Sequence, residues 1–328
     1  MLSNEGYEPP GGTPLEPRLT GIHHVTMIAS DPQRNLDFYT NLLGLRLVKL
    51  TVNFDAPNVY HFYYGDGLGS PGTILTFFPF PGARGGRQGA GQTATTALAI
   101  APASLGYWVD RLLAARITYD GPTVRGETRV LSFKDPDGLA LELVTDANAV
   151  LQAPWERGPV PAEHQIRGVA GVTLWEDPAE PTREFLTDVL GFEAGGTHDD
   201  VQRFLSNGQF ADVRSVRGFW SGVVSAGTVH HVAWRTADDE QQLAWRKKLT
   251  TFAPDVTMVQ DRQYFNSIYF REPGGVLFEI ATDTPGFTID EAPDELGTSL
   301  KLPPRYEAQR ALIEDTLPKI VLPEGVRA

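Results

Sequence analysis

A fourfold internal repeat constrains the fold of this chain more than any other feature. The unit that begins at Ile22 contains an apolar strand, an Asp-Pro turn, a helix closed by Gly44 and three further strand-like runs. Similar units begin near Thr95, Val169 and Val229. Each unit is a supersecondary element that must bury its apolar face against a neighbouring unit. The sequence therefore predicts an α+β fold made of four βαβββ modules.

Two gapless matches within the chain support true repetition. Residues 135–146 (DPDGLALELVTD) align with 272–283 (EPGGVLFEIATD), and 23–31 (HHVTMIASD) align with 230–238 (HHVAWRTAD). Modules of this kind bury their sheets by pairing. Four modules therefore predict two paired-sheet, half-barrel domains.

Stretches rich in proline and glycine divide the chain. Residues 1–18 and about 146–165 lack apolar periodicity, which is typical of tails and linkers. We expect a mobile tail at 1–18 and a linker at 147–166. The linker separates an N-terminal domain segment at 19–146, with modules one and two, from a C-terminal domain segment at 167–284, with modules three and four. A C-terminal extension with a short helix is expected at 285–328.

The composition excludes several classes of function. The chain has 0 cysteines, which rules out disulfides, thiolate metal sites and cysteine nucleophiles. Its net charge of −13 has the wrong sign for a phosphate-backbone binder, so we expect no nucleic-acid partner. No apolar run approaches the roughly 20 residues of a membrane helix, and no signal-peptide pattern is visible. We therefore expect a cytoplasmic protein without a membrane partner.

A carboxylate stands in the middle of an apolar strand. By strand alternation, Glu279 faces the side opposite to Phe278 and Ile280. We expect the bulky side to pack under a helix and Glu279 to point into the concave side of the sheet. Burying a carboxylate is costly unless it is paired or binds a cation.

The order of these elements resembles a known superfamily. Units with a histidine early on the first strand and a glutamate on the last look like the vicinal oxygen chelate superfamily, which includes glyoxalase I, extradiol dioxygenases, fosfomycin-resistance enzymes and bleomycin-binding proteins. Its members place the ligand histidine seven residues before the Asp that starts the helix. That position is His24 before Asp31 and His231 before Asp238, whereas the third module has Ala170 there.

The resemblance implies a metal site held by His24, His231 and Glu279, with no other bound cofactor. These ligands come from modules one and four, which are therefore expected to share one cavity. Two imidazoles and a carboxylate leave coordination positions open, as in non-haem Fe(II) oxygenases, and Mn(II) accepts the same set. The last-strand counterpart in module one is Thr76, which breaks the four-ligand set of glyoxalase I.

Three longer blocks are similar to the dioxygenases that cleave hydroquinone and chlorohydroquinone rings. The blocks are 19–31 (LTGIHHVTMIASD), 60–66 with 69–81 (YHFYYGD and GSPGTILTFFPFP), and 261–283 (DRQYFNSIYFREPGGVLFEIATD). The resemblance implies that the partners are O2 and a small dihydroxylated aromatic of hydroquinone or catechol type. The reaction would insert oxygen into the ring.

The same resemblance implies further site residues. Tyr269, His230 and His23 correspond to catalytic positions, and Thr26 and Arg262 to positions that contact substrate. Alternation predicts that His23 and His230 face away from the ligands, whereas Thr26 shares the face of His24.

Two other residues are expected to have structural roles. His61 lies on an aromatic strand, where a packing role is favoured. Glu142 has the strand position of Glu279 but no histidine partner, so we expect a vestigial or salt-bridged residue.

Two other functions stay open. A glyoxalase-like lyase or isomerase would use Zn²⁺ or Ni²⁺ as a Lewis acid and would not need oxygen. A non-catalytic resistance protein that sequesters a small molecule would generally lack the metal ligands. The sequence also leaves a homo-oligomer open.

Overall fold

The computed structural model describes residues 16–151 and 153–323, so residues 1–15 of the predicted tail lie outside the described residues. Each module contains a strand, a helix and three further strands. Module one consists of β1 (Ile22–Ala29), α1 (Pro32–Asp37), β2 (Arg46–Asn53), β3 (Ala56–Gly65) and β4 (Ile74–Pro79). Module two consists of β5 (Gln92–Ile100), α2 (Leu105–Ala114), β6 (Tyr119–Arg125), β7 (Thr128–Lys134) and β8 (Ala140–Thr145).

The second half of the chain repeats this order. Module three consists of β9 (Val169–Glu176), α3 (Glu180–Glu184), β10 (Glu193–His198), β11 (Val201–Ser206) and β12 (Gln209–Ser215). Module four consists of β13 (Thr228–Thr236), α4 (Asp239–Leu249), β14 (Gln260–Asp261), β15 (Phe265–Arg271) and β16 (Leu277–Pro285). The segment after β16 includes the short helix α5 (Arg310–Thr316).

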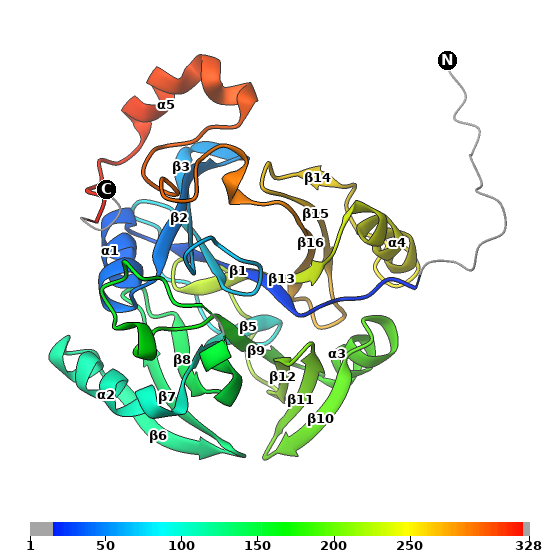
Figure 1. The fold of residues 1–328 in the computed structure, drawn as a ribbon. Helices are drawn as coiled ribbons and strands as arrows, with labels where there is room; N and C mark the ends of the chain where they lie inside the picture. Colours follow the sequence, from blue (N-terminus) through cyan, green and yellow to red (C-terminus); the bar gives the residue numbers. More distant parts are fainter. Residues whose placement is uncertain (1–15, 152, 324–328) are drawn as a thin grey trace, which may run out of the picture.

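The strands form two eight-stranded sheets, which are the upper and lower halves of Figure 1. The first sheet has the order β14-β15-β16-β13-β1-β4-β3-β2 and joins modules four and one. The second has the order β10-β11-β12-β9-β5-β8-β7-β6 and joins modules three and two. The predicted α+β fold of four modules in two paired half-barrels is therefore confirmed. The predicted boundaries of the domain segments stay predictions.

Capping side chains explain where two of the helices begin. Asp31 accepts a hydrogen bond from the backbone N–H of Arg34 at 2.8 Å, and Pro32 occupies the first turn of α1. Asp238 caps α4 in the same way. In module three, the carboxylate of Asp177 instead accepts from the backbone of Gly218, and α3 begins later.

Strand alternation separates the core from the concave side of each sheet. In β1, Val25 and Met27 belong to the main apolar core, as Phe278 and Ile280 do in β16. Fully burying a side chain of this size contributes roughly 1.5–3 kcal/mol. The intervening residues, Glu279 among them, point to the concave side, as the sequence predicts.

The segment after β16 crosses the end of the first sheet. Lys49 on β2 is completely buried and pairs with Asp290 at 2.5 Å and with Glu291. Phe287 packs against Tyr63 at a ring distance of 5.1 Å. Removing one partner of a buried ion pair typically costs about 3–5 kcal/mol, so these contacts fix the segment firmly. Among residues 16–151 and 153–323, no helix is both long and apolar enough to cross a membrane.

Two buried glutamates lie side by side where modules three and four meet. Glu272 accepts hydrogen bonds from Thr182 Oγ1 at 2.6 Å and from two backbone N–H groups. Glu176 is fully buried, and neither carboxyl oxygen has a hydrogen-bond partner among the described residues. Burial, reinforced by Glu272, raises the pKa of Glu176 to about 9. Glu176 is therefore neutral at pH 7.

We expect Glu176→Gln to flatten the pH dependence of stability. A raised folded-state pKa stabilises the fold below the unfolded value of about 4.3, and this contribution disappears as the pH rises towards 9. Between pH 6 and 8.5 the wild type should therefore lose on the order of 1–3 kcal/mol more unfolding free energy than the variant. Urea denaturation at both pH values measures this difference. Glu240→Gln, at an exposed glutamate, is the control, and equal slopes for wild type and Glu176→Gln would contradict the expectation.

Candidate active site

Three ligand-type side chains meet on three adjacent strands of the first sheet. His24 stands on β1, His231 on β13 and Glu279 on β16, with β13 in the middle. His24 Nε2 lies 3.4 Å from Glu279 Oε2, and His231 Nε2 lies 2.9 Å from the same oxygen. The two Nε2 atoms are 3.4 Å apart. All three side chains are buried and form one cluster, which we call the triad.

Glu279 carries its charge inside the protein. Its Oε1 accepts a hydrogen bond from Ser267 Oγ, whereas Oε2 faces the two imidazoles without a well-directed hydrogen bond. Burial acts to raise the pKa of Glu279, but His24 and His231 hold it well below its ordinary value. Burial also lowers the pKa of His231, which favours the neutral imidazole that metal binding requires.

The three inward-facing atoms fit a metal ion. Nitrogen and oxygen ligands lie about 2.0–2.2 Å from a bound metal, so two ligands at right angles are about 3 Å apart. The separations of 2.9 to 3.4 Å in the triad agree with this spacing. A buried oxygen without a directed hydrogen bond is the atom that a cation would satisfy. The triad is therefore a candidate metal site.

Each ligand histidine contacts the histidine that precedes it in the sequence. His23 Nδ1 lies 2.9 Å from His24 Nδ1, and His230 Nδ1 lies 2.7 Å from His231 Nδ1. For Nε2 to bind a metal, Nδ1 of the ligand histidine must carry the proton, and it then donates a hydrogen bond to the Nδ1 of the neighbouring histidine. Burial lowers the pKa of His230 to about 3 and that of His23 well below its ordinary value. Both neighbours therefore stay neutral acceptors that orient the ligand rings.

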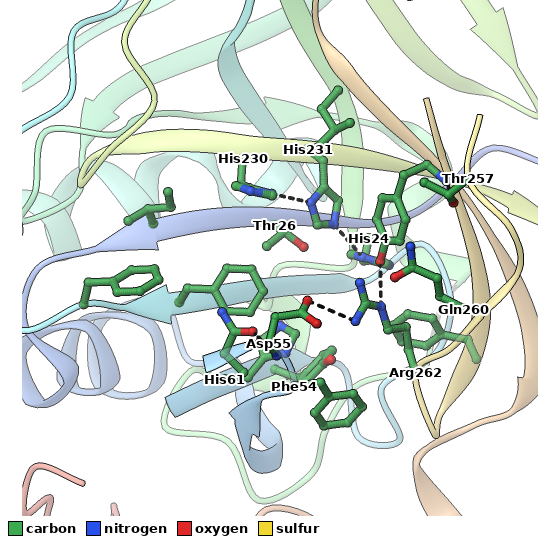
Figure 2. A pocket seen from close by; sticks show the side chains of 18 residues that line it. His24, Thr26, Phe54, Asp55, His61, His230, His231, Thr257, Gln260 and Arg262 are labelled. Atoms are coloured by element: carbon green, nitrogen blue, oxygen red, sulfur yellow. Dashed lines mark hydrogen bonds and ion pairs between the residues drawn. The ribbon is translucent and has the colours of Figure 1, made fainter. Parts of the chain in front are cut away.

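The expectation that His230 faces away from the ligands is wrong. The register between β1 and β13 shifts at this point, so His230 is the extra residue of a β-bulge. The bulge leaves its side chain on the cavity wall beside His231 (Figure 2). A second bulge lies at His23, which is buried and does not line the cavity.

His24 and His231 of the triad line a cavity of about 580 Å³ on the concave side of the first sheet (Figure 2). Much of its wall is aromatic, and the aromatic side chains are Phe54, Tyr63, Phe78, Phe80, Phe265 and Tyr269. A concave site of this size with aromatic walls suits a planar organic ligand.

Thr26, Tyr269 and Arg262 line this cavity together with the two histidines of the triad. Arg262 Nε donates a hydrogen bond to Tyr269 Oη at 3.1 Å, and its Nη1 lies 3.3 Å from Asp55 Oδ2. Burial raises the pKa of Tyr269, so the phenol keeps its proton at neutral pH. Thr26 Oγ1 lies 2.9 Å from Thr76 Oγ1, so the two hydroxyl groups are hydrogen-bonded to each other.

Two further residues of the site were not predicted. His61, expected to have a packing role, lines the cavity. Because the next residue, Phe62, belongs to the core, strand alternation already placed His61 on the concave face. Ser267 donates a hydrogen bond to Glu279 and holds it in place. It lies two residues before Tyr269 on β15, so strand alternation puts both side chains on the same face, and this spacing could have identified Ser267.

The comparisons with known proteins agree with this geometry. Residues 21–143 and 168–280 match the model of the Glyoxalase/Bleomycin resistance protein/Dioxygenase superfamily. The candidate ring-cleaving dioxygenase MhqO of Bacillus subtilis (strain 168) is 44% identical over 299 residues, which cover 90% of this chain and 95% of MhqO. A chlorohydroquinone/hydroquinone 1,2-dioxygenase of Sphingobium indicum is 34% identical over 89% of this chain and 94% of its own.

A solved structure also resembles this chain throughout. The crystal structure of a candidate dioxygenase from Bacillus subtilis subsp. subtilis str. 168 superimposes with a TM-score of 0.90. It is 42% identical and covers 94% of this chain and 99% of its own.

We expect Ser267→Ala to weaken metal binding. Loss of the hydrogen bond to Oε1 frees the Glu279 carboxylate to rotate, and loss of such an outer contact typically costs about 10- to 100-fold in metal affinity. Competition with a chromogenic chelator measures the metal Kd. The matched control is Ser132→Ala, because Ser132 donates to Glu142 in the second sheet at 3.3 Å. A metal Kd that is the same in Ser267→Ala and Ser132→Ala would refute this role.

Proposed function

We propose that this chain, which belongs to the Glyoxalase/Bleomycin resistance protein/Dioxygenase superfamily, is a metal-dependent ring-cleaving dioxygenase. Its substrate would be a dihydroxylated aromatic of hydroquinone or catechol type, and its co-substrate O2. The observation that carries the proposal is a buried triad of two histidines and one glutamate, whose histidines line an aromatic-walled cavity. Similarity to proteins named as ring-cleaving dioxygenases supports it.

We assign Fe(II) to the triad of His24, His231 and Glu279, with Mn(II) as the alternative. When bound, such a metal supplies the redox chemistry that allows O2 to react with an aromatic ring. Because His24 and His231 line the cavity, a metal held by the triad would be accessible from it. His23 and His230 keep the two imidazoles in the tautomer and orientation that this role needs.

The aromatic walls would hold the substrate ring and exclude water. Phe78 and Phe265 line the cavity from β4 and β15, and Phe265 also contacts the His24 ring at 5.1 Å. A dry cavity strengthens every hydrogen bond made inside it. The rings therefore orient the substrate and increase the effect of the few polar groups that reach it.

Tyr269 is the polar group placed to act on the substrate. Its Oη already accepts from Arg262 Nε, so its own O–H proton can point into the cavity. With a raised pKa, Tyr269 donates a hydrogen bond rather than carrying charge. It would stabilise negative charge that develops on a substrate oxygen, and Arg262 would keep it in position.

The triad is tested by loading the protein with metal without oxygen and then following O2 uptake. The wild type loaded with Fe(II) should consume O2 with hydroquinone or catechol. His231→Ala should lower the rate at least about 100-fold, because a triad ligand is lost. His198→Ala, at an exposed histidine on β10, is the control. Substrate turnover without O2 would instead favour the glyoxalase-like lyase or isomerase, and full turnover by His231→Ala would refute the triad.

Tyr269→Phe tests the hydrogen bond to the developing charge. It removes one hydroxyl and keeps the ring, which packs edge-on against His231 at 5.6 Å. We expect kcat to fall about 100-fold while KM changes less, because the hydrogen bond strengthens in the transition state. Steady-state O2 uptake over a range of substrate concentrations separates the two constants. A change confined to KM would assign Tyr269 to substrate binding alone.

A further inference from the structure

A line of hydrogen bonds runs from the strand of His24 to the neighbouring wall of the cavity. Thr26 Oγ1 on β1 lies 2.9 Å from Thr76 Oγ1 on β4, and Thr76 Oγ1 lies 2.9 Å from His61 Nε2 on β3. Neighbouring strands are about 4.8 Å apart, so His61 stands two strands away from His24. Figure 2 shows His61 and His24 on different sides of the cavity.

The His61 ring is held in one orientation and keeps one nitrogen unused. It lies 4.0 Å from the Tyr63 ring and 4.3 Å from the Phe78 ring, measured between centroids. Burial lowers the pKa of His61 well below its ordinary value, so the imidazole is neutral and has one donor and one acceptor nitrogen. Nε2 is bonded to Thr76, whereas Nδ1 has no hydrogen-bond partner among the described residues.

A fixed polar atom on an aromatic wall serves as a specificity element, because it rejects ligands that leave it unpaired. A substituent para to the oxygen held at the triad points away from the triad across the cavity. An ortho substituent stays beside the triad. The wall that carries His61 therefore suits the para position.

We propose that His61 is a specificity-determining residue whose Nδ1 hydrogen-bonds the polar substituent that lies para to the substrate oxygen held at the triad. This inference rests on the proposed function and narrows its substrate class to hydroquinone-type rings, in preference to catechols. Thr76 acts as a positioning residue, because it fixes the rotation of the His61 ring.

The test compares the binding of phenol, hydroquinone and catechol to the metal-loaded protein without oxygen, by titration calorimetry. In the wild type, hydroquinone should bind about fivefold tighter than phenol after correction for its two equivalent hydroxyls, and catechol should not share this gain. In His61→Phe, which keeps a ring packed between Tyr63 and Phe78, the gain should disappear while the Kd of phenol stays the same. His61→Gln, which retains a donor and an acceptor, should restore part of it.

The matched control is His164→Phe. His164 is likewise stacked on a tyrosine, Tyr107, and hydrogen-bonded to a hydroxyl, that of Ser104, but it lies outside the cavity. This control should keep the fivefold ratio between the Kd of phenol and the Kd of hydroquinone. A ratio that is the same in His61→Phe and the wild type overturns the role of His61, even if the enzyme consumes O2 with hydroquinone. Absence of O2 uptake by the loaded wild type with both hydroquinone and catechol would overturn the proposed function itself.

Discussion

Burying a carboxylate in protein costs several kcal/mol unless other groups balance its charge, and Glu279 is completely buried within the first sheet. The surrounding structure is arranged around this charge. Ser267 donates a hydrogen bond to Oε1 of Glu279, and the imidazoles of His24 and His231 face Oε2. Because these imidazoles come from β1 and β13, the site exists only when the first and last modules pair.

The second sheet contains the same carboxylate position and balances its charge differently. Glu142 pairs with Ala97 across β5 and β8, as Glu279 pairs with Ala233 across β13 and β16. Arg125 binds both oxygens of Glu142, at 2.8 and 2.9 Å, so a guanidinium occupies the role that a metal would have. A guanidinium satisfies the charge but offers no open coordination position. The salt-bridged alternative expected for Glu142 is thus the one the structure shows, and it explains how one half-barrel can keep the fold without this chemistry.

The fold could be predicted from the sequence because it depends on periodic patterns, whereas the ligand set of the triad was implied by the resemblance to the vicinal oxygen chelate superfamily. The repeat predicted the modules, and alternation put Glu279 on the concave face. Alternation failed for His230, because a β-bulge inserts one residue and no local pattern announces it. In module three, the register makes Gly171 the counterpart of His24, whereas Ala170 is the counterpart of the bulged residue His23. For His61, the sequence favoured packing, and the ring does contact Tyr63 and Phe78, but its contact with Thr76 depends on the pairing of β3 with β4, which the sequence did not show.

The candidate metal site and the wall that we propose to select the substrate depend on different parts of the chain. The triad is held by pairing among β1, β13 and β16. The wall that carries His61 is supported from the opposite side, because His61 packs against Tyr63 and Tyr63 packs against Phe287. Phe287 belongs to the segment after β16, which Lys49 anchors through Asp290 and Glu291. Changes in that segment can therefore alter the shape of the substrate wall while the ligand geometry stays intact, so that selectivity can vary among chains that share one metal site.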